Sequence, residues 1–168
     1  MVLSHDPTYS MFFSKRYSQA STAFRNAKRP REAAVCDAYL LREKARSQPS
    51  TAAVQREKAF IDAGVAFNTC AQAAPQKLAE ERKAYYKNAG DCFSEGRKLR
   101  EAGKSYVNAE KYTLAARAYR KGGHFDELVE VLQQHGKSIK SEEVHRMTEV
   151  ARMFYFKVSV DSDEGEPC

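Results

Sequence analysis

Residues 86–135 repeat one pattern of large and small side chains every thirteen residues. They read YKNAGDCFSEGRK (86–98), LREAGKSYVNAEK (99–111), YTLAARAYRKGGH (112–124) and FDELVEVLQQH (125–135). Counting from zero, each row has a large apolar residue first, two small or apolar residues at positions 3 and 4, another large residue at position 7 and a closing residue at position 10. On a helix, which turns about 100° per residue, these positions share one face.

Thirteen residues make one helix of about eleven residues and a tight turn. We therefore predict four short helices that pack as antiparallel neighbours. Ala and Gly at positions 3 and 4 let the backbones approach closely, and the aromatic side chains at positions 0 and 7 fill the space between the helices.

The same register appears before this stretch. Asp6-Pro7 is typical of a helix start, with a helix through Phe13, and the register then begins at Tyr17 and again at Pro30. In the second of these rows Asp37 stands where other rows have an aromatic, so we expect Cys36 or Leu40 to make that contact instead. This helix is expected to end near Arg46.

Longer helices are expected over residues 52–71 and 75–95, and a final helix runs from Ser141 through Tyr155. Gly136 is expected to end the helix before it as a C-terminal glycine. No segment alternates with period two, so the predicted fold is all-α, a tetratricopeptide-like α-solenoid of about nine antiparallel helices. It is one domain over 1–157, with a front block (7–46), a loop (47–51) and a main block (52–157), and residues 158–168 form an acidic, disordered tail.

The net charge is +6, and its distribution is uneven. Residues 15–58 hold eleven Lys or Arg against four acids, and residues 97–121 hold eight against two, whereas the tail is acidic. This balance favours an acidic partner, either nucleic acid or an acidic protein segment, or else reflects a basic solvated helix surface. With no basic, apolar leader, no run of eighteen apolar residues and no CxxC pair, we expect an intracellular protein, nuclear or cytoplasmic, with no membrane partner.

In pairs, the rows resemble tetratricopeptide repeats. The small and large positions of that 34-residue motif are matched by Leu99, Ala102, Gly103, Tyr106, Ala115, Tyr119 and Gly122. The spacing differs, because successive helices follow at thirteen residues without the longer turn between repeats.

A narrower resemblance covers residues 10–156. The segments FRNAKRPRE (24–32), AYLLREKAR (38–46), AARAYRKGGHFDE (115–127) and VARMFYF (150–156) are similar to the helical-repeat region of large fungal proteins. Those proteins carry a UvrD-type superfamily 1 helicase motor and are akin to the tetratricopeptide-and-ankyrin-repeat-containing proteins of animals. The resemblance implies an accessory scaffold of a nucleic-acid motor, here without the motor.

The sequence gives no enzyme or cofactor pattern. Gly103-Lys104-Ser105 and Gly136-Lys137-Ser138 lack the earlier glycine of a phosphate-binding loop and follow no strand. The four histidines form no i, i+4 pair and no zinc-ligand spacing with cysteine. Cys36, Cys70 and Cys92 lie on apolar helix faces, which suits packing more than a reactive thiolate. We expect no enzymatic activity, no cofactor, no metal and no small-molecule substrate.

The remaining candidates are polar residues on the outward positions of the rows. Lys104 and Arg117 occupy equal places in successive rows and could align as a stripe, and Asn108 lies one turn beyond Lys104. Such residues could hold carboxylates of an extended acidic segment through charge-assisted hydrogen bonds. The predicted partner-binding residues are Lys87, Arg97, Arg100, Lys104, Asn108, Arg117, Arg120 and Lys121.

The leading hypothesis is therefore a non-enzymatic helical-repeat scaffold that binds another protein segment. The alternative is a nucleic-acid-binding accessory module that uses the basic residues 15–58 on phosphates, although the sequence has no recognised DNA- or RNA-reading motif. An inactive fragment, and a bland surface that only keeps the protein soluble, are also compatible with the sequence.

Overall fold

A computed structural model describes residues 7–163, and side chains from residue 8 to residue 157. This part of the chain contains nine α-helices, three 3-10 turns and no strand, so the all-α prediction is confirmed. The helices are α1 (Pro7–Phe13), α2 (Tyr17–Asn26), α3 (Pro30–Ser47), α4 (Ala53–Ala73), α5 (Ala79–Glu95), α6 (Leu99–Asn108), α7 (Tyr112–Gly122), α8 (Phe125–His135) and α9 (Ser141–Asp163).

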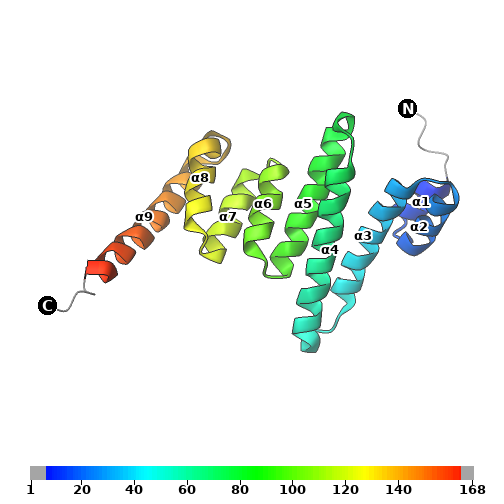
Figure 1. The fold of residues 1–168 in the computed structure, drawn as a ribbon, viewed down its shortest axis with the longest axis horizontal. Coiled ribbons are helices and arrows are strands. Elements are labelled where there is room, and N and C mark those ends of the chain that lie inside the picture. Colours follow the sequence, from blue (N-terminus) through cyan, green and yellow to red (C-terminus); the bar gives the residue numbers. More distant parts are fainter. Residues whose placement is uncertain (1–6, 164–168) are drawn as a thin grey trace.

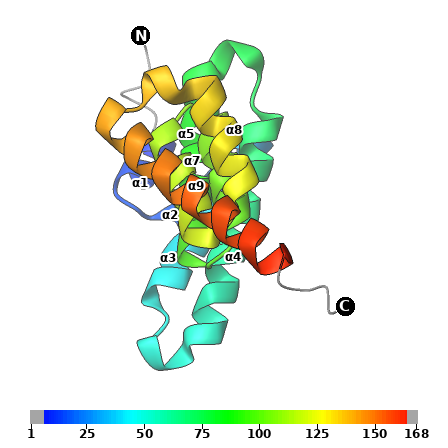
Figure 2. The ribbon, with the colours of Figure 1, turned by 90° about the vertical axis from the view of Figure 1, so that its left-hand side faces the viewer.

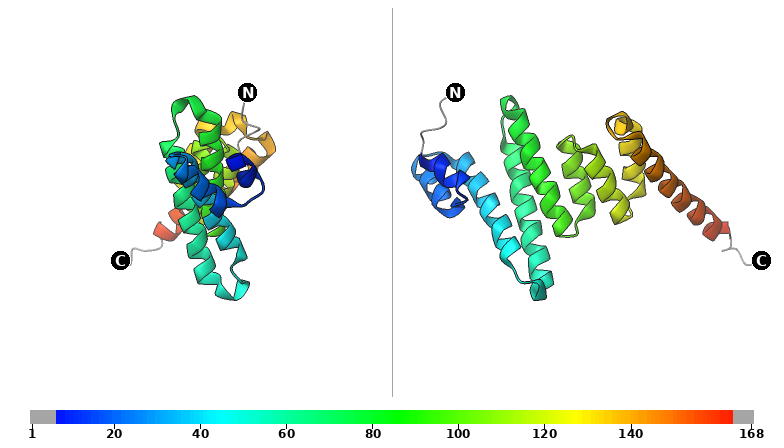
Figure 3. Two further views of the ribbon diagram at one scale, coloured as in Figure 1. Left: turned by 90° about the vertical axis from the view of Figure 1, so that its right-hand side faces the viewer. Right: turned by 180° about the vertical axis from the view of Figure 1, so that it is seen from behind.

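The helices stand side by side in chain order along the longest axis of the molecule (Figure 1). Each packs chiefly against the helix before it and the helix after it, and the view from behind shows the same order (Figure 3). Seen from the C-terminal end, the helices superpose behind α8 and α9 (Figure 2). The three later rows are the short helices α6, α7 and α8, and the first row is the second half of the longer α5.

Small residues at position 4 of one row receive the large residue at position 7 of the next. A Cβ atom placed on Gly64 would lie 2.9 Å from the Phe93 ring, and one placed on Gly90 would lie 2.7 Å from the Tyr106 ring. At Gly103 the distance to the Tyr119 ring would be only 2.3 Å. Each aromatic ring therefore lies directly against the backbone of the preceding helix, a contact that no larger residue permits.

The turns between rows also repeat. Position 11 of a row has a left-handed backbone at Lys28, Arg97, Glu110 and Gly123, and Lys15, in the turn before Tyr17, has the same conformation; φ ranges from 56° to 72°. The next residue donates its N–H to a carbonyl five residues earlier, as Lys98 does to Phe93 at 2.8 Å. These hydrogen bonds satisfy carbonyls that the helix end leaves without partners, as in a Schellman motif.

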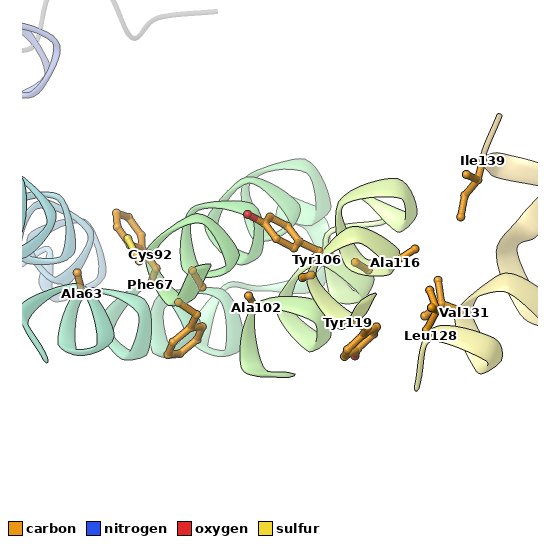
Figure 4. Close-up of a cluster of buried hydrophobic side chains, with 14 of the residues drawn as sticks. Ala63, Phe67, Cys92, Ala102, Tyr106, Ala116, Tyr119, Leu128, Val131 and Ile139 are labelled. Carbon is orange, nitrogen blue, oxygen red and sulfur yellow. The ribbon is translucent and has the colours of Figure 1, made fainter. Parts of the chain in front are cut away.

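The contacts between large and small side chains join into one apolar core that runs from α3 to α9. Figure 4 shows the part of this core between Ala63 of α4 and Ile139. Its members include Phe67, Tyr106, Tyr119 and Leu128, each at most 6% exposed. A second, smaller cluster lies around Phe24 in the front helices; its buried members are Ala20, Phe24, Ala33 and Cys36.

Asp37, at position 7 of its row, makes an interhelical contact of its own. Cys36 is buried, as expected, but the contact between α2 and α3 is made by Asp37 itself. The Ser21 hydroxyl, at position 4 of its row, donates to Asp37 Oδ1 at 2.6 Å, and Arg25 also donates to this carboxylate. A polar pair therefore occupies the place that a small residue and an aromatic ring occupy elsewhere.

The structure confirms the predicted end of α8 and corrects the predicted end of α9. α8 ends at His135, but Gly136 is not left-handed: it has φ −56° and ψ −32° and begins a 3-10 turn, Gly136–Ser138. The final helix continues to Asp163, beyond the boundary predicted at residue 157. The N-cap predicted at Asp6 and residues 164–168 of the predicted tail lie outside the described residues.

Candidate functional site

Four of the eight predicted partner-binding residues already pair with acids of this chain. Lys87 Nζ lies 2.6 Å from Asp91 Oδ2 on α5, and Arg97 Nε lies 3.0 Å from Glu57 Oε1 on α4. The other two pairs join helices two places apart in the row: Arg100 with Glu127, and Arg117 with Glu143. These four charges are partly neutralised and are less available to a ligand.

The two ion pairs between alternate helices shift the pKa values of their glutamates. The hydrogen bond from Arg117 lowers the pKa of Glu143 below its usual value. At Glu127, partial burial acts to raise the pKa, but the hydrogen bond from Arg100 and other favourable contacts hold it below its usual value. Both carboxylates are therefore held in their charged form.

Lys104 and Asn108 line one hollow, of about 300 Å³, between α6 and α8. Tyr119 of α7 also lines it, and α8 contributes Glu127 and Glu130. Arg117 is not among the lining residues, because position 5 of a row faces the helix two places further along, which is α8 for Lys104 and α9 for Arg117. Glu127 is paired with Arg100, so Lys104 has beside it one acid without an ion pair among the described residues, Glu130, which offsets its charge toward an acidic ligand.

Arg120 and Lys121 are exposed near the end of α7 and form no ion pair within the described part of the chain. Lys121 lines a hollow of about 340 Å³ with Arg56, Glu95 and Arg97. Arg120 lines none of the hollows described here.

A neighbouring hollow, which the sequence did not single out, is lined by three arginines. It has a volume of about 350 Å³ and lies where α3, α4 and α5 meet. We call it the arginine hollow; it is lined by Arg42, Arg46, Arg56, Phe60, Asp91, Cys92, Ser94, Glu95 and Tyr106.

Arg42 is held rigidly at this hollow. Its Nη1 donates to Asn88 Oδ1 at 3.0 Å, and its guanidinium carbon lies 4.7 Å from the ring centre of Tyr39 and 5.5 Å from that of Phe67. The side chain is 14% exposed. Stacking on two rings fixes the guanidinium plane, so little side-chain entropy remains to be lost. The Arg42 Nε lies 3.6 Å from Glu43 Oε1, and the Nη1 of Arg46 lies 3.0 Å from the same oxygen, so Glu43 partly neutralises both arginines.

Arg56 has hydrogen-bonding capacity that the protein leaves unused. Its guanidinium carbon lies 5.5 Å from the centre of the Phe60 ring, and its Nε is buried with no hydrogen-bond partner. A buried donor without a partner costs free energy, which an anion in the hollow could recover.

The acids at the hollow differ in their availability. Asp91 accepts hydrogen bonds from Lys87 at 2.6 Å and from the Tyr106 hydroxyl at 2.9 Å. Burial, together with this carboxylate, raises the pKa of Tyr106, so the phenol stays protonated and donates to Asp91. Asp91 is therefore largely compensated, and Glu95 is the one lining acid without an ion pair in residues 8–157.

The three cysteines of the described part are free and buried, as the sequence predicts. Burial raises the pKa of the Cys36 thiol to about 11 and that of Cys92 to about 12, and it raises the pKa of Cys70 as well. Raised pKa values keep these thiols protonated and unreactive, although Cys92 lines the arginine hollow.

Neither Gly-Lys-Ser tripeptide forms a phosphate-binding loop: Gly103 lies inside α6, and Gly136–Ser138 is a 3-10 turn. Among the described side chains, residues 8–157, no three His, Cys, Asp or Glu come together as metal ligands. Between residues 7 and 163, no helix has the length and apolar character needed to cross a membrane.

Comparison with protein-family models, with curated proteins and with solved structures gave no match for this chain.

The spacing of two arginines could have indicated the arginine hollow. Arg42 and Arg46 stand four residues apart and so share a face of α3. Arg56 could not be added from the sequence, because its position depends on how α4 packs back against α3.

Proposed function

We propose that this protein is a non-enzymatic, intracellular scaffold, nuclear or cytoplasmic, in which a tetratricopeptide-like α-solenoid binds an acidic segment of another protein in the arginine hollow. The single observation that carries the proposal is the buried, unpartnered Arg56 Nε beside two further guanidinium groups. The role resembles that of an accessory region of a UvrD-type helicase-like protein.

The arrangement suits a carboxylate joined to an apolar neighbour. Guanidinium groups bind carboxylates through two parallel hydrogen bonds, and Phe60 and Tyr106 supply apolar surface within the hollow. The hollow between α6 and α8 is a weaker candidate, because it has one lysine, Lys104, and because Glu130, which has no ion pair among the described residues, would repel the same ligand.

The basic charge of residues 15–58 gives less support to nucleic-acid binding than composition alone suggests. Several of these residues, such as Lys28 and Arg29, stand in the turns that follow helix C-termini. Positive side chains there interact favourably with the helix dipole, so their positive charge can be explained by helix stability without a nucleic-acid ligand.

The test is fluorescence anisotropy with a labelled peptide of alternating Glu and Leu, compared with a single-stranded oligonucleotide of equal charge. Arg56→Gln should weaken peptide binding by at least about tenfold, since hydrogen bonds between charged groups are worth about 1.5–3 kcal/mol. Arg120→Gln is the matched control, because Arg120 is also unpaired in the described part but lies outside the hollow; its affinity should stay within about twofold. Equal affinities for wild type and Arg56→Gln would contradict the proposal.

Salt separates the two classes of ligand. Peptide binding that rests partly on Phe60 and Tyr106 should weaken modestly as salt rises. A preference for the oligonucleotide, with a loss of about three decades between 50 and 200 mM salt, would instead support a nucleic-acid-binding module.

A further inference from the structure

A pocket lined mainly by aromatic rings lies at the N-terminal end of the row, where α1 and α5 both approach α3. Its volume is about 320 Å³, and small-molecule sites, which are mostly apolar with a few polar groups, begin at about this size. We call it the aromatic pocket; its rings are those of Tyr9, Phe12, Phe13, Phe24, Tyr39 and Tyr85.

The rings hold one another in place. Phe12 of α1 meets Tyr39 of α3 edge to face, with ring centres 5.1 Å apart, and Tyr9 meets Phe24 of α2 in the same way at 5.4 Å. Edge-to-face contacts favour a defined orientation of each ring. The apolar walls are therefore formed before any ligand arrives.

Most polar groups at the pocket already have partners within the protein. Arg29 Nη2 donates to the Tyr9 hydroxyl at 2.7 Å and to Glu32 Oε1 at 2.9 Å. The Tyr85 hydroxyl donates a long hydrogen bond, of 3.4 Å, to Glu81 Oε2. These groups need no partner from a ligand.

Arg31, which also lines the pocket, is the exception. Its guanidinium lies 3.6 Å from a carboxylate oxygen of Glu81 and 3.8 Å from one of Glu32, and both distances are too long for hydrogen bonds. Its Nη1 is buried and has no hydrogen-bond partner. Arg31 therefore has its charge compensated while its capacity to donate hydrogen bonds is left unused.

The charges at the pocket are balanced, which limits the class of ligand. The charged lining residues are Arg31, Glu32 and Glu81, and Glu32 is also paired with Arg29 outside the lining. An anion would lie near two carboxylates, and a cation would lie near Arg31. Since burying a charge without a counter-ion is costly, a neutral ligand with a hydrogen-bond acceptor fits best.

We propose that the aromatic pocket binds a small, neutral, planar aromatic molecule whose carbonyl oxygen accepts a hydrogen bond from Arg31. The ring system of the ligand lies among the aromatic walls. This site is separate from the arginine hollow, so its failure would leave the proposed scaffold function unaffected.

The test is an NMR titration of the ¹⁵N-labelled protein with four probes that share the naphthalene ring. Methyl naphthyl ketone should bind with a Kd of about 1 mM or lower and shift amide resonances in α1, α3 and α5. Ethylnaphthalene, which has no acceptor, should bind at least about fivefold more weakly. Naphthoate and naphthylmethylammonium should each bind at least about tenfold more weakly than the ketone.

Arg31→Met gives a change of preference as a second readout. This variant keeps an apolar stem but removes the donor and the positive charge, so Glu81 is left without its cation. The ketone should then bind no better than ethylnaphthalene, and naphthylmethylammonium should become the tightest of the four probes. A merely disturbed pocket would weaken all four together.

The matched control is Arg146→Met. The guanidinium of Arg146 also lies 3.8 Å from a carboxylate, that of Glu142, but on α9, far from the pocket along the row (Figure 1). This variant should keep the wild-type order of affinities. Far-UV circular dichroism should show both variants to be as helical as wild type.

Three results would overturn the proposal. The ketone could fail to bind at about 1 mM, it could bind no better than ethylnaphthalene, or naphthoate could bind most tightly. All three are measured on wild type, so they decide the matter even if Arg31→Met does not fold.

Discussion

The α2–α3 hairpin and the α6–α7 hairpin use the same register with different chemistry. In α6–α7, Gly103 at position 4 faces the Tyr119 ring at position 7 of the next row, with room for no side chain between them. In α2–α3, Ser21 at position 4 donates a hydrogen bond to Asp37 at position 7 of the next row. The helix geometry therefore fixes which positions meet, and either close apolar packing or a partly buried hydrogen bond can occupy them.

The apolar contact is the more easily broken by adding volume. Gly103→Ala should destabilise the protein by about 3 kcal/mol, because the Cβ would overlap the buried Tyr119 ring and overpacking typically costs 1–3 kcal/mol or more. Gly90→Ala and Gly64→Ala should cost progressively less, in the order of their distances of 2.7 and 2.9 Å to the facing ring. Urea unfolding gives the ranking.

The control for this series is Gly136→Ala. Gly136 has helical backbone angles, and a Cβ there would approach only Val144, at 4.0 Å. This variant should be neutral or stabilised by up to about 1 kcal/mol, as expected for Ala over Gly in a helix. A loss as large as that of Gly103→Ala would mean that Gly itself, and not the close contact, explains the series.

The polar contact is broken by removing one partner. Asp37→Ala should cost about 2 kcal/mol, because the Ser21 hydroxyl, 1% exposed, loses its acceptor. Asp37→Phe alone should also destabilise, since Ser21 leaves too little room for a ring. Combined with Ser21→Gly, it should recover most of that loss and convert the front hairpin to the chemistry of α6–α7. Additive losses in thermal unfolding would show that the two contacts are not equivalent.

Substitutions in the turns should change stability less, and they compare the same two regions. Lys28, after α2, has φ 56°, whereas the equivalent turn after α7 has Gly123, with φ 72°. Lys28→Gly should stabilise the protein by about 1 kcal/mol, and Gly123→Ala should destabilise it by a similar amount, because left-handed backbone is costly for residues with a Cβ. Lys44→Gly, at a helical position in the last turn of α3, is the control and should destabilise. Calorimetric Tm values would check all three.

The smallest expected effect is a pH dependence at the C-terminal end. Arg117 lowers the pKa of Glu143 in the folded state, so this pair stabilises the fold at neutral pH. The contribution is present above the ordinary glutamate pKa and is lost as pH falls through the lower folded value. Arg117→Gln should therefore show a smaller drop in urea midpoint between pH 7 and about pH 3.5 than wild type. Equal drops would mean that the pair contributes nothing.

The repeat made most of the fold predictable, because a thirteen-residue period leaves room for only one helix and one turn. It predicted the helices from Tyr17 to His135 and the buried cysteines. It could not predict that Asp37 makes the contact at position 7 of its row, because a pattern of apolar residues contains no information on a hydrogen bond from Ser21. Gly136 correctly predicted the end of α8, but not the 3-10 turn that follows it.

The candidate site was less predictable than the fold. The sequence marked exposed cations, but their partners belong to other helices: Arg117 pairs with Glu143, twenty-six residues further along. Equal positions in successive rows do not form one stripe, because each faces the helix two places on. The arginine hollow depends on how α3, α4 and α5 meet, which the period of the pattern does not encode.

The central claim is that position 4 of one helix and position 7 of the next are in direct contact along the row. The most direct test is a double-mutant cycle in urea unfolding on Gly103→Ala and Tyr119→Leu. We predict a coupling of at least about 1 kcal/mol, because the smaller Leu side chain gives the added methyl group room. Additive effects, within about 0.3 kcal/mol, would contradict the claim.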